Sequence, residues 1–314
     1  MMEITFILNS DFQQFLEGNL NVDYRSSNDL LNCCLLRGHD VKIVHPEDAI
    51  AGGFSKIYHK KGTQLVETGK SLDTDVLFLR GLGENRNSDV TNNLIFTLES
   101  LEGNVPLIIN TGKSTSYEGK DKQKTLPLPF IPHYKVNSFD ELEDLVNEHS
   151  EGIIIKPIYG LLGLGVEYVQ SVEDIDKWIE ERNIVQDQLK SFVFEKFIPE
   201  QLETRYIFLF GEIVASRTTE KIGHPGKERY GFRFINKEYP QRDVDVVKKS
   251  MELTEMQFGA VDFRGGYVLE INGSGTGTFN QENYTEGKML YDLTDRVIDE
   301  IEKRVKGSHS KIAV

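Results

Sequence analysis

The sequence has little of what marks several large protein classes. Only two of its 314 residues are cysteines, the neighbours Cys33 and Cys34, and they lie in an apolar helical pattern. Such a pair is more typical of small core residues in a reducing compartment than of a disulfide framework or a redox centre. Positive charge is also scarce, because 36 Lys and Arg residues face 50 Asp and Glu residues and leave a formal net charge of −14. That charge repels a phosphate backbone, so we expect no nucleic-acid partner.

Long apolar runs are missing as well. No segment approaches the ~20 apolar residues that cross a bilayer, and the first residues lead into a strand pattern rather than a signal sequence. We therefore expect a cytoplasmic protein without a membrane partner. The sequence leaves open whether the protein forms a homo-oligomer.

What the chain does have is length and an α/β pattern. With 39% hydrophobic residues it can bury more than one core, so two or three domains are expected. Over residues 1–112, apolar runs alternate with helix-spaced segments, which predicts an N-terminal α/β domain built on a parallel sheet. Such sheets bind ligands at the carboxyl ends of their strands, and Arg80 directly follows one of them. Strands are expected at 3–8, 41–44, 75–79 and 106–110, and helices at 27–37 and 94–101.

A polar segment rich in Gly, Ser and Lys at 112–124 marks the start of a second unit. We expect a small α+β subdomain at 113–190, a large subdomain at 191–306 and a mobile tail at 307–314. Within these units, strands are expected at 152–157, 166–169 and 192–195, helices at 139–147 and 172–181, and a hairpin around Gly211.

Residues 258–272 carry the most informative polar pattern. Glu270 and Asn272 are two residues apart on a predicted strand and therefore share a face. A Gly-Gly pair joins this strand to the preceding one, which carries Asp262. A plain two-residue turn would set Asp262 opposite Leu269, so Asp262 joins the other two only if the hairpin is bulged or has a three-residue loop. Two carboxylates and an amide oxygen suit a Mg²⁺ ion that bridges nucleotide phosphates, although the outer face of an ordinary hairpin is also polar.

Lys156 closes an apolar strand and is followed by a loop with glycines at 160, 163 and 165. An unpaired ammonium in such a strand is costly, so a partner is expected, and a nucleotide phosphate would serve. Alternatively, the lysine stem reaches water from a strand edge. Gly163 and Gly165 would let backbone amides lie over phosphates. The loop is neither a Walker loop nor a dinucleotide fingerprint, because the Gly-Lys-Ser/Thr ending and the following helix are missing.

Further candidates for nucleotide contact follow along the chain. The backbone of residues 195–198 is expected either to pair with the edge of an adenine or to be an interdomain hinge, and Glu203 is a candidate acceptor for ribose hydroxyls. Residues 221–232 have the turn chemistry of a closing lid, in which His224 fits a surface role as well as a catalytic one. Arginine matches phosphate and carboxylate oxygens in bidentate fashion. Four arginines lie in this region: Arg205, Arg217, Arg229 and Arg233.

Taken in this order, the segments resemble the ATP-grasp ligases, and within them bacterial glutathione synthetase and the ribosomal-protein glutamate ligases. The resemblance covers residues 112–306. It implies an α/β chain with an N-terminal parallel-sheet (pre-ATP-grasp) domain followed by a two-subdomain α+β ATP-grasp fold. The run after Asn272, Gly-Ser-Gly-Thr-Gly-Thr, departs from the glutathione synthetases, so glutathione is not the expected product. The matching pieces are Ile-Ile-Lys156-Pro with its glycine loop, Glu195-Lys-Phe-Ile-Pro, Glu203-Thr-Arg, Ala-Ser-Arg217, and Val-Asp262 through Glu270-Ile-Asn272.

The resemblance also implies a role for each matching residue. The ATP phosphates would be bound by Lys156, Gly163, Gly165 and one of Lys120 and Lys122, of which the spacing favours Lys122. Adenine would be held by Glu195, Lys196, Phe197 and Ile198, and ribose by Glu203. Two Mg²⁺ ions, with Mn²⁺ as a substitute, would be bound by Asp262, Glu270 and Asn272. The γ-phosphate and the acceptor carboxylate would face Arg205, Arg217 and Arg80.

The implied reaction joins a carboxylate to an amine through an acyl phosphate, with small molecules or peptides as substrates. One alternative is a ligase of the same superfamily that modifies or macrocyclises a peptide or protein side chain. Two others are a small-molecule kinase and a nucleotide-binding protein that performs no ligation. ADP release that does not depend on an amine would indicate the kinase, and the absence of turnover would indicate the binding protein. The full set of carboxylates favours turnover.

Overall fold

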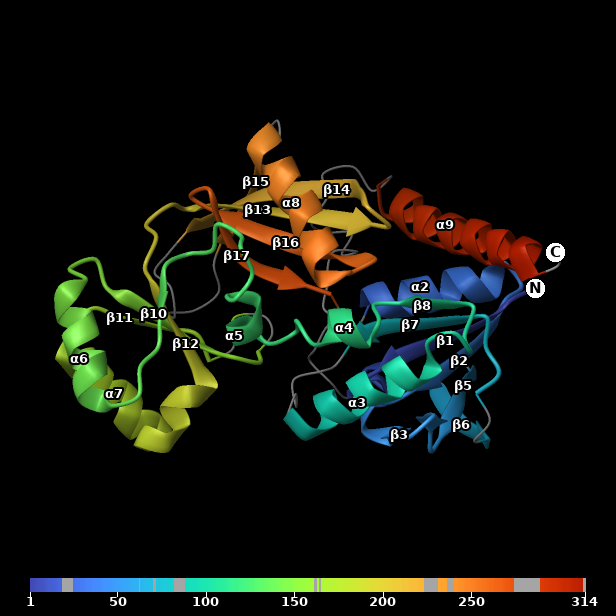
Figure 1. Cartoon of the computed structure of the whole chain (residues 1–314), viewed down its shortest axis with the longest axis horizontal. Helices are drawn as coiled ribbons and strands as arrows, with labels where there is room; N and C mark the ends of the chain where they lie inside the picture. The colour runs from blue at the N-terminus through green and yellow to red at the C-terminus, as the bar shows by residue number, and fades with distance from the viewer. Residues whose placement is uncertain are drawn as a thin grey trace.

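The computed structural model describes residues 1–18, 25–61, 63–69, 72–81, 88–160, 163, 165–222, 231–235, 240–273 and 289–312. Three main sheets lie side by side along the molecule (Figure 1). A six-stranded sheet occupies one end, a four-stranded sheet the other, and a five-stranded sheet lies between them. A short two-stranded ribbon, β3 (Ala49–Ile50) with β4 (Gly53–Phe54), adjoins the first sheet after the 3-10 turn Pro46–Asp48.

The six-stranded sheet is formed by the N-terminal part of the chain. Its order is β6-β5-β2-β1-β7-β8, and its four strands β2, β1, β7 and β8 are parallel, as the sequence predicts. The antiparallel hairpin β5–β6 extends one edge, and no sequence pattern had indicated it. The strands are β1 (Glu3–Leu8), β2 (Asp40–Val44), β5 (Ile57–Lys61), β6 (Gln64–Gly69), β7 (Val76–Gly81) and β8 (Leu107–Ile109).

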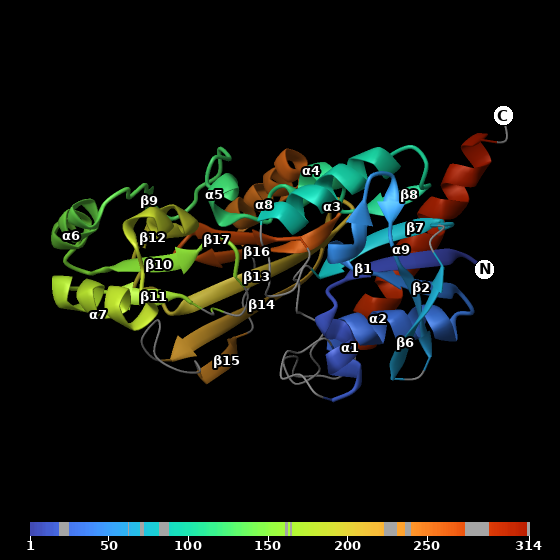
Figure 2. The same cartoon turned by 90° about the horizontal axis from the view of Figure 1, so that it is seen from below.

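Helices cover both faces of this sheet, which is why its strands read as continuous apolar runs. On one face, α2 (Arg25–Leu36) and the C-terminal helix α9 (Met289–Ile312) share a core with β1, while α3 (Ser88–Leu101) packs on the other face (Figures 1 and 2). The short helix α1 (Asp11–Leu16) follows β1. Helix α9 therefore belongs to the first core although it comes from the far end of the chain. It continues through Ile312, where the sequence had suggested a tail beginning at residue 307.

The four-stranded sheet is antiparallel, with the order β11-β10-β12-β9. Helices α6 (Phe139–Glu148) and α7 (Val172–Arg182) cover the face on which Ile153 and Ile155 are buried, so Ile154 and Lys156 lie on the opposite face. Its last strand ends at Lys196, beyond the boundary expected at residue 190, because it pairs with β10 along its whole length. The strands are β9 (His133–Tyr134), β10 (Ile153–Pro157), β11 (Glu167–Val169) and β12 (Phe192–Lys196), the last preceded by the 3-10 turn Gln186–Ser191.

The five-stranded central sheet is antiparallel and shares its two faces between two cores. Helix α8 (Gln241–Thr254) packs with Tyr206 and Phe208 on one face. On the other face, Ile207 and Leu209 join the core of the first sheet, because alternate residues of a strand point to opposite faces. Its order is β15-β14-β13-β16-β17, with β13 (Leu202–Leu209), β14 (Glu212–Ile222), β15 (Gly231–Ile235), β16 (Phe258–Arg264) and β17 (Tyr267–Asn272).

Asn110 joins the first sheet to the central one. It follows β8, is buried, and has a left-handed backbone conformation with a φ of 64°. Its side-chain amide donates to the carbonyls of Phe258 (2.9 Å) and Gly273 (3.2 Å), and its carbonyl oxygen accepts from the backbone of Gln257 and Phe258 (3.2 Å each). Asparagine tolerates this conformation better than other non-glycine residues. Asn110 thus fixes both where β16 begins and where β17 ends.

We expect Asn110→Ala to lower the free energy of unfolding by about 2–4 kcal/mol, because it strains the left-handed backbone and leaves buried backbone groups without partners. Asn110→Gly should cost ~1 kcal/mol less, since glycine adopts positive φ without strain. Urea unfolding of both variants measures the difference. The exposed Asn104, which makes one hydrogen bond to Ser100, provides the control Asn104→Ala. Equal stability of Asn110→Ala and Asn104→Ala would contradict the role of this junction.

Candidate functional site

A row of charged side chains crosses the central sheet on the face opposite α8. The strand register sets Arg217 opposite Arg205, Arg205 opposite Asp262, and Asp262 opposite Glu270. Residues directly opposite each other on neighbouring strands share a face, so these four side chains form one row. Arg205 and Arg217 were predicted to face the γ-phosphate, and Asp262 and Glu270 to bind a metal. These four residues are therefore neighbours on a single surface.

A bulge in the β16–β17 hairpin makes this row possible. The turn itself has two residues, Gly265 and Gly266, with φ values of 56° and 80°, and it sets Arg264 opposite Tyr267. The register then shifts between Asp262 and Phe263, so that Asp262 lies opposite Glu270 rather than Leu269. The bulge that the sequence required for a shared face is present.

Asp262, Glu270 and Asn272 converge at this point. The Arg205 guanidinium donates to both Asp262 oxygens, at 2.5 and 2.6 Å, and Asp262 is buried. The Asn272 amide nitrogen donates to Asp262 Oδ2 (3.1 Å) and to Glu270 Oε1 (3.0 Å). One amide thus contacts both carboxylates, which brings the three predicted metal ligands within a single hydrogen-bond network.

Helix α5 (Lys120–Gln123) brings positive charge to the same place from the side of the four-stranded sheet (Figures 1 and 2). Lys120 Nζ lies 3.6 Å from Glu270 Oε2 and donates to the Gly160 carbonyl at 3.2 Å. Gln123 fixes the helix to β17, because its side chain accepts from the Ile271 amide (2.8 Å) and donates to the Ile271 carbonyl (2.7 Å).

Burial and the surrounding cations act in opposite directions on the pKa of Glu270. Burial alone would raise the pKa of Glu270, but Lys120, the Asn272 amide, Lys156 and Arg205 outweigh it and lower the pKa to about 2. Glu270 is therefore ionised throughout the physiological range. A charged carboxylate is what a hard cation requires.

A second cluster lies on the adjoining four-stranded sheet. Glu195 is 1% exposed and forms ion pairs through both of its oxygens, with Lys124 Nζ and with Lys156 Nζ, each at 2.6 Å. Lys156 thus has the partner that its apolar strand requires, but the partner is a carboxylate of the protein rather than the phosphate that the sequence suggested. Both oxygens of the Glu195 carboxylate are thus paired with lysines of the protein. Lys124 was not among the residues predicted from the sequence to contact the nucleotide.

Lys122, favoured from the sequence, lies away from both clusters. Its ammonium donates to Ser116 Oγ at 2.6 Å and lies 4.9 Å from the centre of the Tyr117 ring. Lys120 and Lys124 are four residues apart and share a helix face, whereas Lys122 between them does not. The structure thus brings Lys120, not Lys122, to Glu270.

Glu203 and Arg80, predicted to contact the ribose and the reactants, have partners within the protein. Glu203 pairs with Arg264 at 2.9 Å. Arg80 is buried against the rings of Phe78 and Phe258, and burial lowers its pKa to about 10. Phe258 begins the strand on which Asp262 lies four residues later, so Arg80 lies beside the strand that carries Asp262.

The segment 196–198 has most of its backbone donors engaged. The Lys196 amide donates to Pro132 and the Phe197 amide to Gly152, at 2.9 and 3.2 Å, while the Ile198 amide has no acceptor among the described residues. Gly163 and Gly165 have φ values of 75° and 76°, and a Cβ on Gly165 would meet the Pro157 ring at 2.8 Å. Glycine is therefore required at 165 for both backbone and space.

Several predictions fall outside the described residues. These are His224, Arg229 and most of the expected lid, residues 161, 162 and 164 of the glycine loop, and the glycine-rich run after Gly273. Arg233 lies on β15, but its side chain is not among the parts of the chain that the structure describes.

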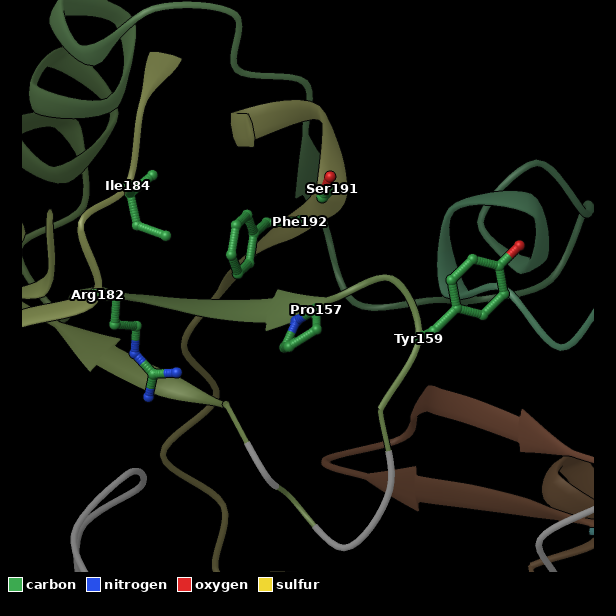
Figure 3. Close-up of a pocket in the computed structure, with 6 residues that line it drawn as sticks. All are labelled: Pro157, Tyr159, Arg182, Ile184, Ser191 and Phe192. Atoms are coloured by element: carbon green, nitrogen blue, oxygen red, sulfur yellow. The ribbon is translucent and has the colours of Figure 1, made fainter. Parts of the chain in front are cut away.

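A hollow of about 610 Å³ lies at the end of strand β10 (Figure 3). None of the residues that line it belongs to the charged row. It is lined by Pro157, Tyr159, Arg182, Ile184, Ser191 and Phe192.

The donor set near Asp262 fits a magnesium ion. Within the described part of the chain, no group of three or more His, Cys, Asp or Glu side chains would hold a metal by itself. Asp262 and Glu270 present carboxylate oxygens, whereas Asn272 now turns its amide nitrogen toward both of them and would have to rotate to offer its oxygen. Two carboxylates and an amide oxygen would leave coordination positions for water and phosphate, which is how Mg²⁺ is commonly bound, rather than in a cage made only of protein. Among the helices that the structure describes, none has the length and apolar character to span a membrane.

Comparisons with known proteins identify the fold. No protein-family model and no curated protein matches the chain. Solved structures do match: the ATP-grasp ligase PsnB, complexed with a minimal precursor, aligns with a TM-score of 0.64 and 13% identity over 95% of this chain and 99% of that chain. The macrocyclase MdnC from Microcystis aeruginosa MRC, bound with the precursor peptide MdnA, aligns with a TM-score of 0.60 and 15% identity over 95% and 100%. D-alanine–D-alanine ligase from Bacillus anthracis, complexed with ATP, aligns with a TM-score of 0.62 and 15% identity over 99% of both chains.

The low pKa of Glu270 predicts how Glu270→Gln changes the dependence of stability on pH. A carboxylate whose pKa is lower in the folded state stabilises that state above its unfolded pKa, and this contribution is lost as the pH falls toward 2. We expect the wild type to exceed the variant in free energy of unfolding by on the order of 2 kcal/mol at pH 6, with the difference shrinking between pH 5 and pH 2. Denaturant titrations along a pH series measure it.

The control is Glu181→Gln, which removes a carboxylate from an exposed ion pair with Lys177. Its difference from the wild type should stay within about 0.5 kcal/mol at every pH. A Glu270→Gln difference that did not change with pH would show that Lys120 and its neighbours do not stabilise the Glu270 charge.

Proposed function

Because the chain has the ATP-grasp fold, we propose that it is an ATP- and Mg²⁺-dependent ligase that joins a carboxylate to an amine through an acyl phosphate. The observation that carries this proposal is the hydrogen-bond network of Asp262, Glu270 and Asn272 beside the Lys120 ammonium. Carboxylates that bind a metal lie next to cations that bind phosphate. This combination suits a metal–nucleotide complex better than either ligand alone.

The nucleotide contacts follow from which groups remain accessible. Lys120 and Lys156, whose side chains are 11% and 14% exposed, would bind the phosphates, with the glycine loop at 163 and 165 over them. The Ile198 amide would bind the adenine edge, and Glu203 would bind ribose while it remains paired with Arg264. The small and central sheets would thus hold the nucleotide between them.

Asp262, Glu270 and Asn272 would hold Mg²⁺, with two ions in the full complex and Mn²⁺ as a substitute. When bound, the metal offsets the negative charge on the phosphate oxygens during transfer. Asp262 would contribute while it remains hydrogen bonded to Arg205, because a carboxylate has about four lone-pair positions and Arg205 and Asn272 do not occupy all of them.

The residues of the row would position the reactants rather than form bonds with them. A substrate carboxylate oxygen attacks the γ-phosphorus, the bond to the β-phosphate oxygen breaks, and ADP leaves. The amine then attacks the acyl carbon, phosphate leaves, and the nitrogen loses a proton. Arg217, next to Arg205, would supply the positive charge that counters repulsion between the anionic carboxylate and the triphosphate, and the buried Arg80 would add to it from beside strand β16. Exclusion of water would protect the acyl phosphate from hydrolysis.

A second candidate is a ligase that modifies or macrocyclises a peptide. It is favoured by the likeness to PsnB and MdnC, which were solved with precursor peptides and align over nearly their whole length. The same residues would activate a side-chain carboxylate of the peptide.

The function is tested by screening amino acids and peptides, singly and in pairs, for stimulated ADP release with Mg·ATP, followed by mass analysis of the products. We expect ADP release that requires both a carboxylate and an amine, and a product whose mass equals the two substrates minus one water. A peptide that loses one water in a single-substrate reaction would identify the macrocyclising alternative. A phosphorylated product that forms without any amine would contradict ligation.

We expect Glu270→Ala to reduce ADP release at least a hundredfold while the protein stays folded, because the metal loses a charged ligand. Asp262→Ala should be equally inactive but also less stable, since Arg205 loses its bidentate partner. The control Asp245→Ala removes an exposed carboxylate on α8 that accepts only from Gln241 among the described contacts. Near-normal turnover in both site variants would refute the metal assignment.

A further inference from the structure

The buried Glu195 carboxylate is paired with two cations, although one would be enough to neutralise its charge. Its single negative charge lies between the Lys124 and Lys156 ammonium groups, one on each carboxylate oxygen, each at 2.6 Å. Burial alone would raise the pKa of Glu195, but the two lysines outweigh it and lower the pKa. Because one cation suffices to neutralise one carboxylate, either lysine is able to leave without stranding an unpaired buried charge.

The surroundings of the two lysines decide which one is able to leave. The Lys124 side chain is 2% exposed, its ammonium donates to the Leu269 carbonyl at 3.3 Å, and it lies 4.5 Å from the centre of the Phe130 ring. Every one of these partners belongs to the fold, so Lys124 has no route to a ligand. Lys156 is 14% exposed and lies on the strand that leads into the glycine loop.

We propose that Lys124 is a positioning residue that keeps Glu195 neutralised, so that Lys156 exchanges the Glu195 carboxylate for a phosphate of the bound nucleotide. The inference rests on the proposed function, because it requires a nucleotide polyphosphate at Lys156. Lys124 touches no substrate. Its effect is to lower the cost of releasing Lys156, since Glu195 retains a partner when Lys156 moves.

If Lys156 exchanges Glu195 for a phosphate, Lys124 affects the binding of phosphate. A lysine that served only to stabilise the fold would not. Without Lys124, Glu195 would depend on Lys156 alone, and moving Lys156 to a phosphate would leave a buried carboxylate unpaired. Phosphate binding should then weaken, while binding of the nucleoside part should not change. Removing the Glu195 charge as well should free Lys156 again.

The test is calorimetric titration of the full-length protein with Mg·ADP and, separately, with adenosine, which lacks phosphates. The variants are Lys124→Met, Glu195→Gln and the double variant. We expect Lys124→Met to weaken Mg·ADP binding by about tenfold, with adenosine binding unchanged, and the double variant to bind Mg·ADP at least as tightly as the wild type. The control Lys177→Met removes an exposed lysine on α7 and should leave both affinities unchanged.

If Lys124→Met does not fold, the double variant still tests the inference. It removes both charges of a buried pair together, so neither charge is left buried without its partner. Weaker Mg·ADP binding by the folded double variant than by the wild type would overturn the inference. Wild-type-like Mg·ADP binding by Lys124→Met, or an equal loss of affinity for Mg·ADP and adenosine, would overturn it too. The proposed function would fail separately, through a wild type that binds no Mg·ADP.

Discussion

The extra residue that bulges strand β17 decides which side chains the central sheet presents to its neighbours. Without the register shift at Asp262, Glu270 would point toward α8 and into an apolar core, where an unpaired carboxylate is costly. With it, Asp262, Glu270 and Asn272 face the four-stranded sheet and helix α5. The position of Lys120, the charge on Glu270 and the pairing of Arg205 all depend on this one shift.

Ion pairs link the segment around α5 to both the small and the central sheet. Lys120, which begins the helix, lies beside Glu270 on β17, and Lys124, the residue that follows its last turn, pairs with Glu195 on β12. Gln123 docks the same helix on the edge of β17 and so covers backbone groups that an edge strand would otherwise expose. In a protein with a net charge of −14, three lysines thus gather at one place, Lys120 beside Glu270 and Lys124 and Lys156 beside Glu195.

The sequence predicted the parts of this account that depend on local pattern. Apolar runs indicated the parallel strands. The Gly265-Gly266 turn predicted that Asp262 would share a face with Glu270 only if the hairpin had a bulge or a three-residue loop. Contacts between distant segments had no local signal: the pairing of Lys124 with Glu195 and the packing of α9 on the first sheet arise only from the tertiary fold. The sequence spacing favoured Lys122 over Lys120 as the nucleotide contact. It could not indicate that Lys120 is the one that lies beside Glu270, since the orientation of a four-residue helix is set by where it docks.

The most direct test of the central claim is electron paramagnetic resonance of Mn²⁺ added to the protein with and without ADP. If the network of Asp262, Glu270 and Asn272 holds a metal that also contacts the nucleotide, bound Mn²⁺ should show hyperfine coupling to ³¹P in the presence of ADP. That coupling should belong to a spectrum distinct from that of aqueous Mn²⁺ with ADP, and Glu270→Gln should leave only the aqueous spectrum. A protein-bound spectrum that persists unchanged in the variant, or a wild-type spectrum identical to that of aqueous Mn²⁺ with ADP alone, would contradict the account.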